Sequence, residues 1–200
     1  MQSSSVDPHR RPETLACAAE QDETRLIAEV AAGRLPAFDT LYRNYHPRLT
    51  RILDRMTRRP ALVEEVLNDT MWVIWNHAGR YNGASKVSTW IFAIAYRKAL
   101  KALAGLDEPL GDEAADERPS AEPGPEQRLD AQELRVLLGR ALTQLSAPQR
   151  AVVELTYFHD LGYREIAEIV DCPIDTVKTR MFHARRRLRG LIAGRLEDWL

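Results

Sequence analysis

The sequence predicts an all-α protein made of two small helical domains joined by a flexible, acidic and proline-rich linker. Three observations support this prediction. Apolar residues recur at spacings of three and four along most of the chain, without the alternation of a β-strand. A stretch of prolines and acids interrupts this helical pattern near the middle. Near the C-terminus, two short helical patterns flank Asp171 and Pro173, as in a helix-turn-helix.

Composition limits the kinds of protein that this chain can be. Of the 200 residues 44% are hydrophobic, which is enough for two modest cores. No apolar run reaches the roughly 20 residues of a membrane span, and the N-terminus lacks the apolar stretch of a secretory signal. We therefore expect a cytoplasmic protein that does not insert into a membrane.

The chain shows no residue pattern typical of an enzyme or a metalloprotein. Its two cysteines, Cys17 and Cys172, lie far apart, and its five histidines are scattered without ligand spacing. No nucleophile stands beside a base in a recognisable motif. We expect no enzymatic activity, no metal, no cofactor and no small-molecule substrate.

The net charge of −1 hides two oppositely charged regions. Residues 104–127 contain eight acids and one base, a balance of −7, whereas residues 174–195 contain seven bases and one acid, a balance of +6. An acidic connector therefore masks a basic C-terminal helix. This distribution is typical of a protein that binds nucleic acid through one face.

The first part of the chain is expected to form a tail followed by one helical domain. Residues 1–22 are polar without sustained periodicity and predict a disordered tail. Helical patterns then follow one another over about residues 23–32, 36–56, 60–78 and 88–103. Gly33 is a stop signal after the first pattern, and Pro47 is a kink or restart in the second. The predicted domain spans residues 23–103.

A linker and a second domain are expected to follow. Residues 104–127 hold four prolines besides their acids, and such a segment buries too little apolar surface to offset its ordering entropy. Leucines at helical spacing resume from Arg128, and Pro148 opens a further helix. The second domain therefore spans residues 128–200 and contains the helix-turn-helix.

The helix-turn-helix is the strongest functional signal in the sequence. Its first helix runs from about Tyr163 to Val170, and Asp171 and Pro173 end it. The second helix opens near Asp175 and buries the stripe Val177, Met181, Ala184 and Leu188. The candidate DNA contacts on and beside its outer face are Thr176, Lys178, Thr179, Arg180, His183, Arg185, Arg186, Arg187 and Arg189.

The alternative interpretation of this basic helix is a solvated, charged surface helix. The turn residues and the apolar spacing of both helices favour the DNA-binding motif instead. Such a second helix enters the major groove while its cations hold phosphates.

Two features of the first domain add to this interpretation. Glu64, Glu65 and Asp69 form an acidic strip which, taken alone, indicates an ordinary solvated helix surface. The loop over residues 81–88, followed by a basic helix, could hold an unstacked base and its strand. The aromatic residues Trp72, Trp75, Tyr81 and Trp90 are either a stacking platform for bases or, as their helical spacing favours, mostly core.

Several segments resemble the extracytoplasmic-function (ECF) RNA polymerase sigma factors of the sigma-70 class. Residues 163–189, YREIAEIVDCPIDTVKTRMFHARRRLR, resemble the domain that binds the promoter −35 element. Residues 37–49, AFDTLYRNYHPRL, resemble the first conserved segment of the family's N-terminal domain. Residues 62–75, LVEEVLNDTMWVIW, resemble its acidic helix, and residues 88–103, STWIFAIAYRKALKAL, resemble the segment that opens the −10 element.

The resemblance implies an alternative sigma factor that binds core RNA polymerase and directs promoter-specific initiation through −10 and −35 elements. In this family the acidic helix docks on core RNA polymerase, which assigns that role to Glu64, Glu65 and Asp69. An anti-sigma factor is a further partner that the family implies. The implied −10 contacts are Tyr81, Asn82, Ser85, Lys86, Ser88, Trp90, Arg97, Lys98 and Lys101.

The chain departs from the family pattern at a few positions. Val87 and Ser88 replace a common aromatic-Arg pair, and Arg97 replaces a frequent Asn, so the resemblance does not fix the −10 preference. Asp171 stands where Gly is frequent, at a turn that Asp can adopt at some cost. Ser146 replaces a usual Pro.

Two rival functions make different predictions. A helix-turn-helix regulator that acts without core RNA polymerase would bind duplex DNA by itself. A helical interaction module would keep its function after Glu64→Lys and Glu65→Lys, a double substitution that should abolish polymerase binding by a sigma factor.

Overall fold

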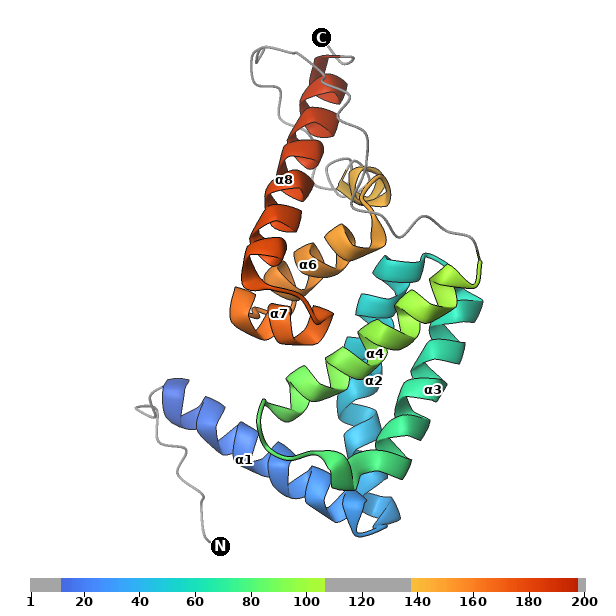
Figure 1. Cartoon of the computed structure of the whole chain (residues 1–200), viewed down its shortest axis with the longest axis vertical. Helices are drawn as coiled ribbons and strands as arrows, with labels where there is room; N and C mark the ends of the chain where they lie inside the picture. The colour runs from blue at the N-terminus through green and yellow to red at the C-terminus, as the bar shows by residue number, and fades with distance from the viewer. Residues whose placement is uncertain (1–11, 107–137, 198–200) are drawn as a thin grey trace, which may run out of the picture.

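The computed structural model describes residues 12–106 and 138–197, and within these ranges it contains helices and no strand. The all-α prediction is therefore confirmed. The helices form an N-terminal group, α1 to α4, and a C-terminal group, which consists of residues 138–143 and α6 to α8 (Figure 1). The predicted linker lies outside the described residues except for 104–106. None of the described helices is both long and apolar enough to cross a membrane.

The first helix begins earlier than the sequence predicted. Helix α1 spans Pro12–Ala31, so the expected tail over residues 1–22 is wrong for residues 12–22, and residues 1–11 lie outside the described residues. The early turns are rich in Ala, Glu and Gln, which favour helix without an apolar stripe. Gly33, at φ 76°, ends the helix as predicted.

Helix α2 spans Leu35–Thr57 without a break at Pro47. Pro47 is exposed, so water can bond the carbonyl that the proline leaves without a partner. The buried stripe of α2 includes Leu41, Tyr45 and Leu49, which are fully inaccessible to solvent. The helix ends at Arg58, a left-handed residue whose N–H bonds the Asp54 carbonyl.

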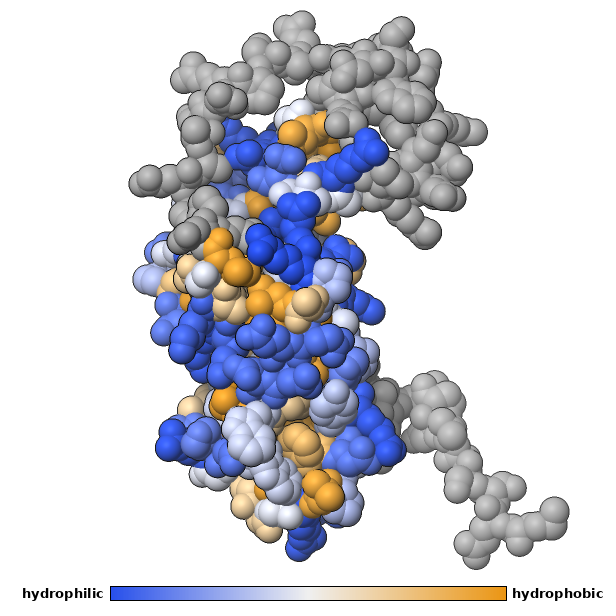
Figure 2. All heavy atoms as spheres, turned by 90° about the vertical axis from the view of Figure 1, so that its right-hand side faces the viewer, coloured by the Kyte–Doolittle hydropathy of each residue, from blue (hydrophilic) through white to orange (hydrophobic). Residues whose placement is uncertain are grey.

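The rest of the N-terminal group packs on α2. Helix α3 spans Pro60–His77, the 3₁₀ turn η1 spans Ala78–Arg80, and α4 spans Val87–Ala104. Both helices pack against α2 and against each other. The side of the molecule on which α3 lies is largely hydrophilic, with separate apolar patches between the polar side chains (Figures 1 and 2).

The C-terminal group contains three helices after the turn at residues 144–146. Helix α6 spans Ala147–Tyr157, α7 spans Tyr163–Val170 and α8 spans Ile174–Glu197. Ser146 caps α6 through a reciprocal pair of hydrogen bonds with Gln149, which explains why this chain needs no proline at that position.

The two groups of helices share one continuous apolar core in this arrangement. Helix α6 packs on α2, and α7 packs on α4. Every residue of α6 from Ala147 to Leu155 is buried, because α8 covers the helix from within its own group and α2 covers it from the other.

Candidate nucleic-acid and protein interfaces

The helix-turn-helix forms as the sequence predicted. Asp171 adopts the left-handed conformation, with φ 51° and ψ 53°, and the Cys172 N–H closes the turn on the Ala167 carbonyl at 3.1 Å. Val177 and Ala184 of α8 are fully buried, and Met181 is 2% exposed. These residues hold α8 against α6 and α7, so its orientation is set by apolar packing.

The predicted DNA contacts occupy the outer side of α8 and its edges. Three of them, Thr176, Arg180 and Arg187, are half-buried at the edge of the apolar stripe. The others are exposed: Lys178, Thr179, His183, Arg185, Arg186 and Arg189. A recognition helix needs this arrangement, in which apolar packing fixes one side and polar groups present the other.

Several of these side chains have partners within the protein. The Lys178 ammonium pairs with Asp175 at 2.9 Å, and the Thr179 hydroxyl donates to the Asp175 carbonyl at 2.8 Å. Arg185 donates to the Tyr157 hydroxyl at 3.0 Å, with its guanidinium 5.7 Å from the ring centre. A residue of α6 therefore positions Arg185.

Phe182 is an exposed apolar residue that the sequence analysis left out of the site. It is 62% exposed on α8, one helical turn from Thr179 and Arg186, with its ring edge-on to His183. The signal that could have found it was present, because an aromatic residue stood on a face otherwise predicted to be polar.

The loop before α4 is ordered by its own polar groups. The Tyr81 hydroxyl donates to the Ser85 carbonyl at 2.6 Å, and the Asn82 side chain accepts the Ala84 N–H at 3.0 Å. Gly83, at φ 72°, allows the reversal of the chain. The Tyr81 ring lies 5.7 Å from that of Trp90, and both residues are half-buried. The loop therefore presents a preformed shape.

The remaining predicted −10 residues differ in accessibility. Arg97 and Lys101 are exposed on α4, whereas Ser88 is buried. The Lys86 ammonium lies 2.8 Å from Glu165 of α7, and its bond to Glu165 raises the pKa of Lys86. This loop and the helix-turn-helix are thus in direct contact.

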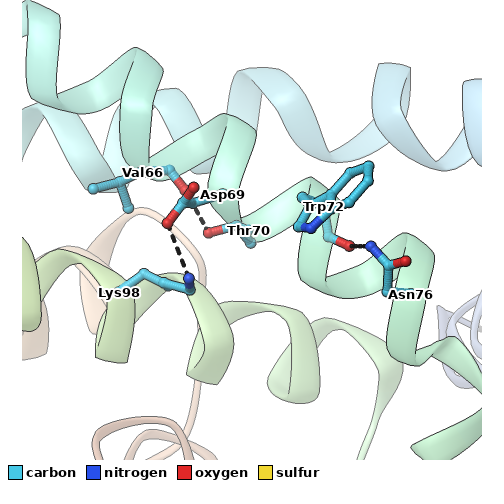
Figure 3. Close-up of polar contacts among 6 residues, drawn as sticks. All are labelled: Val66, Asp69, Thr70, Trp72, Asn76 and Lys98. Atoms are coloured by element: carbon cyan, nitrogen blue, oxygen red, sulfur yellow. Dashed lines mark hydrogen bonds and ion pairs between the residues drawn. The ribbon is translucent and has the colours of Figure 1, made fainter.

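The acidic strip lies on the exposed side of α3. Glu64 and Glu65 are open to solvent, but Asp69 pairs with Lys98 of α4 at 2.9 Å (Figure 3). This ion pair therefore links Asp69, which is predicted to dock on core RNA polymerase, to Lys98, which is predicted to bind the −10 strand. Within the described ranges, no group of His, Cys, Asp and Glu side chains could hold a metal ion.

Trp72 corrects the expectation for the aromatic residues. It is 67% exposed on the same helix as the acids and points away from α4 (Figure 3), whereas Trp75 packs edge-on to Phe38 at 5.1 Å. The helical spacing favoured the core for most of the four aromatic residues, and Trp72 is the exception, because it lies beyond the edge of the buried stripe.

Comparisons with known proteins place this arrangement in a family. Two family models match the chain: "Sigma-70 region 2" over residues 41–107 and "Sigma-70, region 4" over residues 135–188. These ranges correspond to α2–α4 and to the C-terminal group.

Individual relatives agree with the family models. The chain is 30% identical to the ECF RNA polymerase sigma factor RpoE of Cereibacter sphaeroides, over 76% of this chain and 84% of that protein. It is 28% identical to the ECF RNA polymerase sigma-E factor of Escherichia coli, over 82% and 90% respectively.

Solved structures share the fold and part of the sequence. CnrH, in complex with the cytosolic domain of CnrY, matches with a TM-score of 0.61 and 20% identity, over 84% of this chain and 96% of CnrH. The sigma factor RpoE of Bartonella quintana, in complex with the anti-sigma factor NepR, matches with a TM-score of 0.55 and 25% identity, over 78% and 96%. The chain belongs to the ECF RNA polymerase sigma factors.

Proposed function

We propose that this protein is an alternative sigma factor that binds core RNA polymerase and directs initiation at promoters with −10 and −35 elements. The observation that carries the proposal is the exposed basic face of α8, whose other side is held in place by the apolar packing of the helix-turn-helix. The N-terminal group of helices adds an acidic helix and a preformed loop. This combination provides a DNA-binding surface and a separate protein-binding surface. Its family consists of DNA-binding regulators of transcription.

The −35 element is proposed to bind the N-terminal half of α8. Lys178, Thr179 and His183 would lie toward base edges, and Thr176 and Arg180 would border them. Arg185 and Arg186 would hold the backbone, with Arg187 and Arg189 as further phosphate contacts that set register. Phe182 joins this set because an exposed aromatic ring in the major groove can contact the methyl group of thymine.

The −10 element is proposed to bind the loop before α4 and the basic side of α4. The loop residues Tyr81, Asn82 and Ser85 would shape the pocket for an unstacked base, with Trp90 behind them. The cations would hold the strand backbone. These cations are Lys86, Arg97, Lys98 and Lys101. Ser88 is buried here, unlike the other proposed −10 residues.

Core RNA polymerase is proposed to dock on the outer side of α3. Glu64 and Glu65 provide charge, and Trp72 provides an exposed aromatic anchor about two turns further along. Tryptophan is enriched at the centres of protein interfaces, where acids alone contribute mainly steering. Asp69 would contribute while it also positions Lys98.

The domain boundaries and the cellular setting are part of the same proposal. Residues 23–103 would form the domain for polymerase and −10 binding, and residues 128–200 the −35 domain, joined by the acidic linker over 104–127. The protein would act in the cytoplasm. An anti-sigma factor is the proposed inhibitor, since the RpoE of Bartonella quintana was solved with one.

Run-off transcription with core RNA polymerase tests the proposal directly. A pool of promoter fragments with randomised spacers is transcribed with and without this protein. Specific transcripts that require the protein would support the sigma factor and identify its promoter. Absence of transcripts, together with failure to co-elute with core RNA polymerase, would favour the rival regulator, which should then bind duplex DNA alone.

A further inference from the structure

Tyr157 is an exposed aromatic residue at the boundary between α6 and α8. It is the last residue of α6 and is 55% exposed, although the helix is buried from Ala147 to Leu155. Its hydroxyl lies against Arg185 of α8, which is one of the predicted −35 contacts. Tyr157 therefore stands where the predicted DNA-binding surface meets the helix that supports it.

The end of α6 holds Tyr157 in a fixed position. Leu155, two residues earlier, is fully buried, and α6 packs on α8. The Phe158 N–H bonds the Glu154 carbonyl at 3.0 Å, and the Leu161 N–H bonds the Leu155 carbonyl at 3.1 Å. Both backbone bonds close the turn that follows the helix. The Tyr157 side chain is thus presented by a rigid support, which a site that binds its ligand in one geometry requires.

Arg185 uses only part of its hydrogen-bonding capacity within the protein. Its Nε donates to the Tyr157 hydroxyl at 3.0 Å, and its guanidinium lies 5.7 Å from the centre of the Tyr157 ring. The other N–H groups of a guanidinium belong to its terminal nitrogens. Arg185 is exposed, and no carboxylate of a described residue pairs with it. Its charge and its terminal N–H groups are therefore available to a ligand.

The Tyr157 hydroxyl has a hydrogen to donate as well. A phenol hydroxyl both accepts and donates hydrogen bonds. Because the Tyr157 oxygen accepts the bond from Arg185, its own hydrogen points away from that guanidinium. In the part of the chain that the structure describes, no group accepts this hydrogen. The pair therefore presents neighbouring donors, next to a positive charge, on the surface of the protein.

Neighbouring donors beside an uncompensated positive charge fit a phosphate group. Arginine binds phosphate oxygens through charge-assisted hydrogen bonds, and tyrosine hydroxyls are among the groups that bind DNA phosphates. Lys178, nearer the start of α8, differs because Asp175 already compensates its charge. Arg186 and Arg189, which are exposed on the same helix as Arg185, extend the positive charge. A chain of phosphates fits this run of cations better than a single carboxylate does.

We propose that Tyr157 and Arg185 form a phosphate clamp, in which the tyrosine hydroxyl and the terminal nitrogens of the arginine bind the same backbone phosphate of duplex DNA. The clamp rests on the function proposed above and extends the −35 surface from α8 onto α6. Tyr157 is neutral, so it adds a hydrogen bond and holds Arg185 without adding charge. A phosphate contact carries no sequence information, so the clamp sets how α8 sits on the duplex and not which bases it selects.

Binding of the free, full-length protein to a short duplex of random sequence tests the clamp. Phosphate contacts do not depend on sequence, so they are measurable at low salt even in a protein that needs polymerase for specific binding. Tyr157→Phe keeps the ring beside the guanidinium and removes only the hydroxyl. Its affinity should fall about threefold to tenfold. The slope of log K against log salt should not change, because no cation is lost.

Arg185→Ala and the double variant separate a clamp from a mere support. Arg185→Ala should reduce the slope by about one, since it removes a cation from a phosphate. If the Tyr157 hydroxyl itself binds the phosphate, Tyr157→Phe should still weaken binding about twofold or more in the Arg185→Ala protein. If Tyr157 only supports Arg185, Tyr157→Phe should have no effect in that protein, and this result would overturn the clamp.

Tyr42→Phe is the matched control, since it removes a hydroxyl from a half-buried tyrosine of α2, in the other group of helices. It should change neither the affinity nor the slope. Equal affinities of the wild type and Tyr157→Phe would also overturn the clamp. If Tyr157→Phe instead weakened only co-elution with core RNA polymerase, the ligand would be a protein carboxylate. The duplex assay contains no polymerase, so failure of the proposed function, seen as absence of run-off transcripts, is distinguishable from failure of the clamp.

Discussion

The cationic side chains of α8 differ in the interactions within the protein that they would break in order to contact DNA. Lys178 would break its ion pair with Asp175, and the two side chains are 56% and 83% exposed. An exposed ion pair of this kind contributes about 0–1 kcal/mol to stability, so replacing Asp175 by a DNA phosphate as the partner of Lys178 costs little free energy. Arg185 instead remains against Tyr157 while it presents its guanidinium outward. The structure thus separates an adaptable cation from a pre-positioned one.

Arg186→Ala should weaken promoter binding by the holoenzyme and reduce its salt dependence. Each lost phosphate contact lowers the slope of log K against log salt by about one. The measurement is promoter affinity at several salt concentrations. Arg25→Ala, on the exposed side of α1, is the control and should leave the slope unchanged. A slope equal to that of the wild type in Arg186→Ala would contradict a phosphate contact.

Phe182→Ala should reduce discrimination for thymine within the −35 element. A good base contact is worth about 1–3 kcal/mol, and the apolar part of a thymine contact is its methyl group. Promoters in which single −35 thymines are replaced by deoxyuridine should bind wild-type holoenzyme more weakly at one position. The variant should show no such difference there. A methyl effect of equal size in both proteins would exclude Phe182 as its source.

The stability of the protein should respond to pH through two opposing residues. Burial raises the pKa of Glu154 from 4.5 to about 7, against Arg55 and Arg51. Its contribution to the free energy of unfolding is therefore complete below about pH 4.5 and is lost as pH rises through about 7. Burial, with Arg48 and Arg51, lowers the pKa of His159 from 6.5 to about 4 despite Asp160, so its contribution is complete above about pH 6.5 and is lost as pH falls through about 4.

The two effects should nearly cancel in the wild type between about pH 4.5 and 6.5. In Glu154→Gln only the histidine remains, so acidification should lower the free energy of unfolding. In His159→Gln only the carboxyl remains, so acidification from about pH 7 should raise the free energy of unfolding. Denaturant unfolding at several pH values measures both, and slopes of the same sign in the two variants would contradict this assignment.

At the scale of secondary-structure elements, α3 serves two surfaces at once. Its buried side, including Leu67 and Ile74, is part of the core, while its outer side carries the acids and Trp72. Asp69 connects this outer side to α4 through Lys98. A change in the proposed docking surface would therefore reach the predicted −10 surface through one ion pair.

Removal of the docking surface on α3 should abolish polymerase binding without unfolding the protein. Trp72→Ala should weaken binding by about 2 kcal/mol, roughly thirtyfold, as expected for an aromatic anchor. Glu64→Lys with Glu65→Lys should abolish it, since like charges would face the partner. Co-elution with core RNA polymerase measures both, with Asp39→Lys on α2 as an exposed control. Full binding by Trp72→Ala would place the docking surface elsewhere.

Elements with a local signal were predictable from the sequence, and contacts between them were not. Helix α7 matches its predicted bounds because Gly162 and Asp171 mark both ends. Helix α1 was predicted too short because its first turns favour helix through composition alone. The bond from Arg150 to Met56 joins residues 94 positions apart, and no periodicity encodes such a pair. Trp72 was missed because spacing alone does not mark the edge of a buried stripe, whereas Phe182 was missed although it stood on a face predicted to be polar.

At the scale of the whole molecule, the shared core should make the two groups of helices unfold as one. Scanning calorimetry of the wild type should show a single transition, because their core is continuous. Glu154→Arg should separate it into two transitions, since each group would then unfold independently. A single transition in the variant, at a lower temperature, would show that the groups do not fold independently.

Helix α6 carries Arg150 and Glu154 into the protein's interior, since it is buried from Ala147 to Leu155. Replacing Arg55 and Glu154 together with leucine should stabilise the protein, because apolar isosteres of buried pairs often gain about 1–4 kcal/mol. The contact between the two groups of helices is thus weaker than an apolar contact of the same size would be.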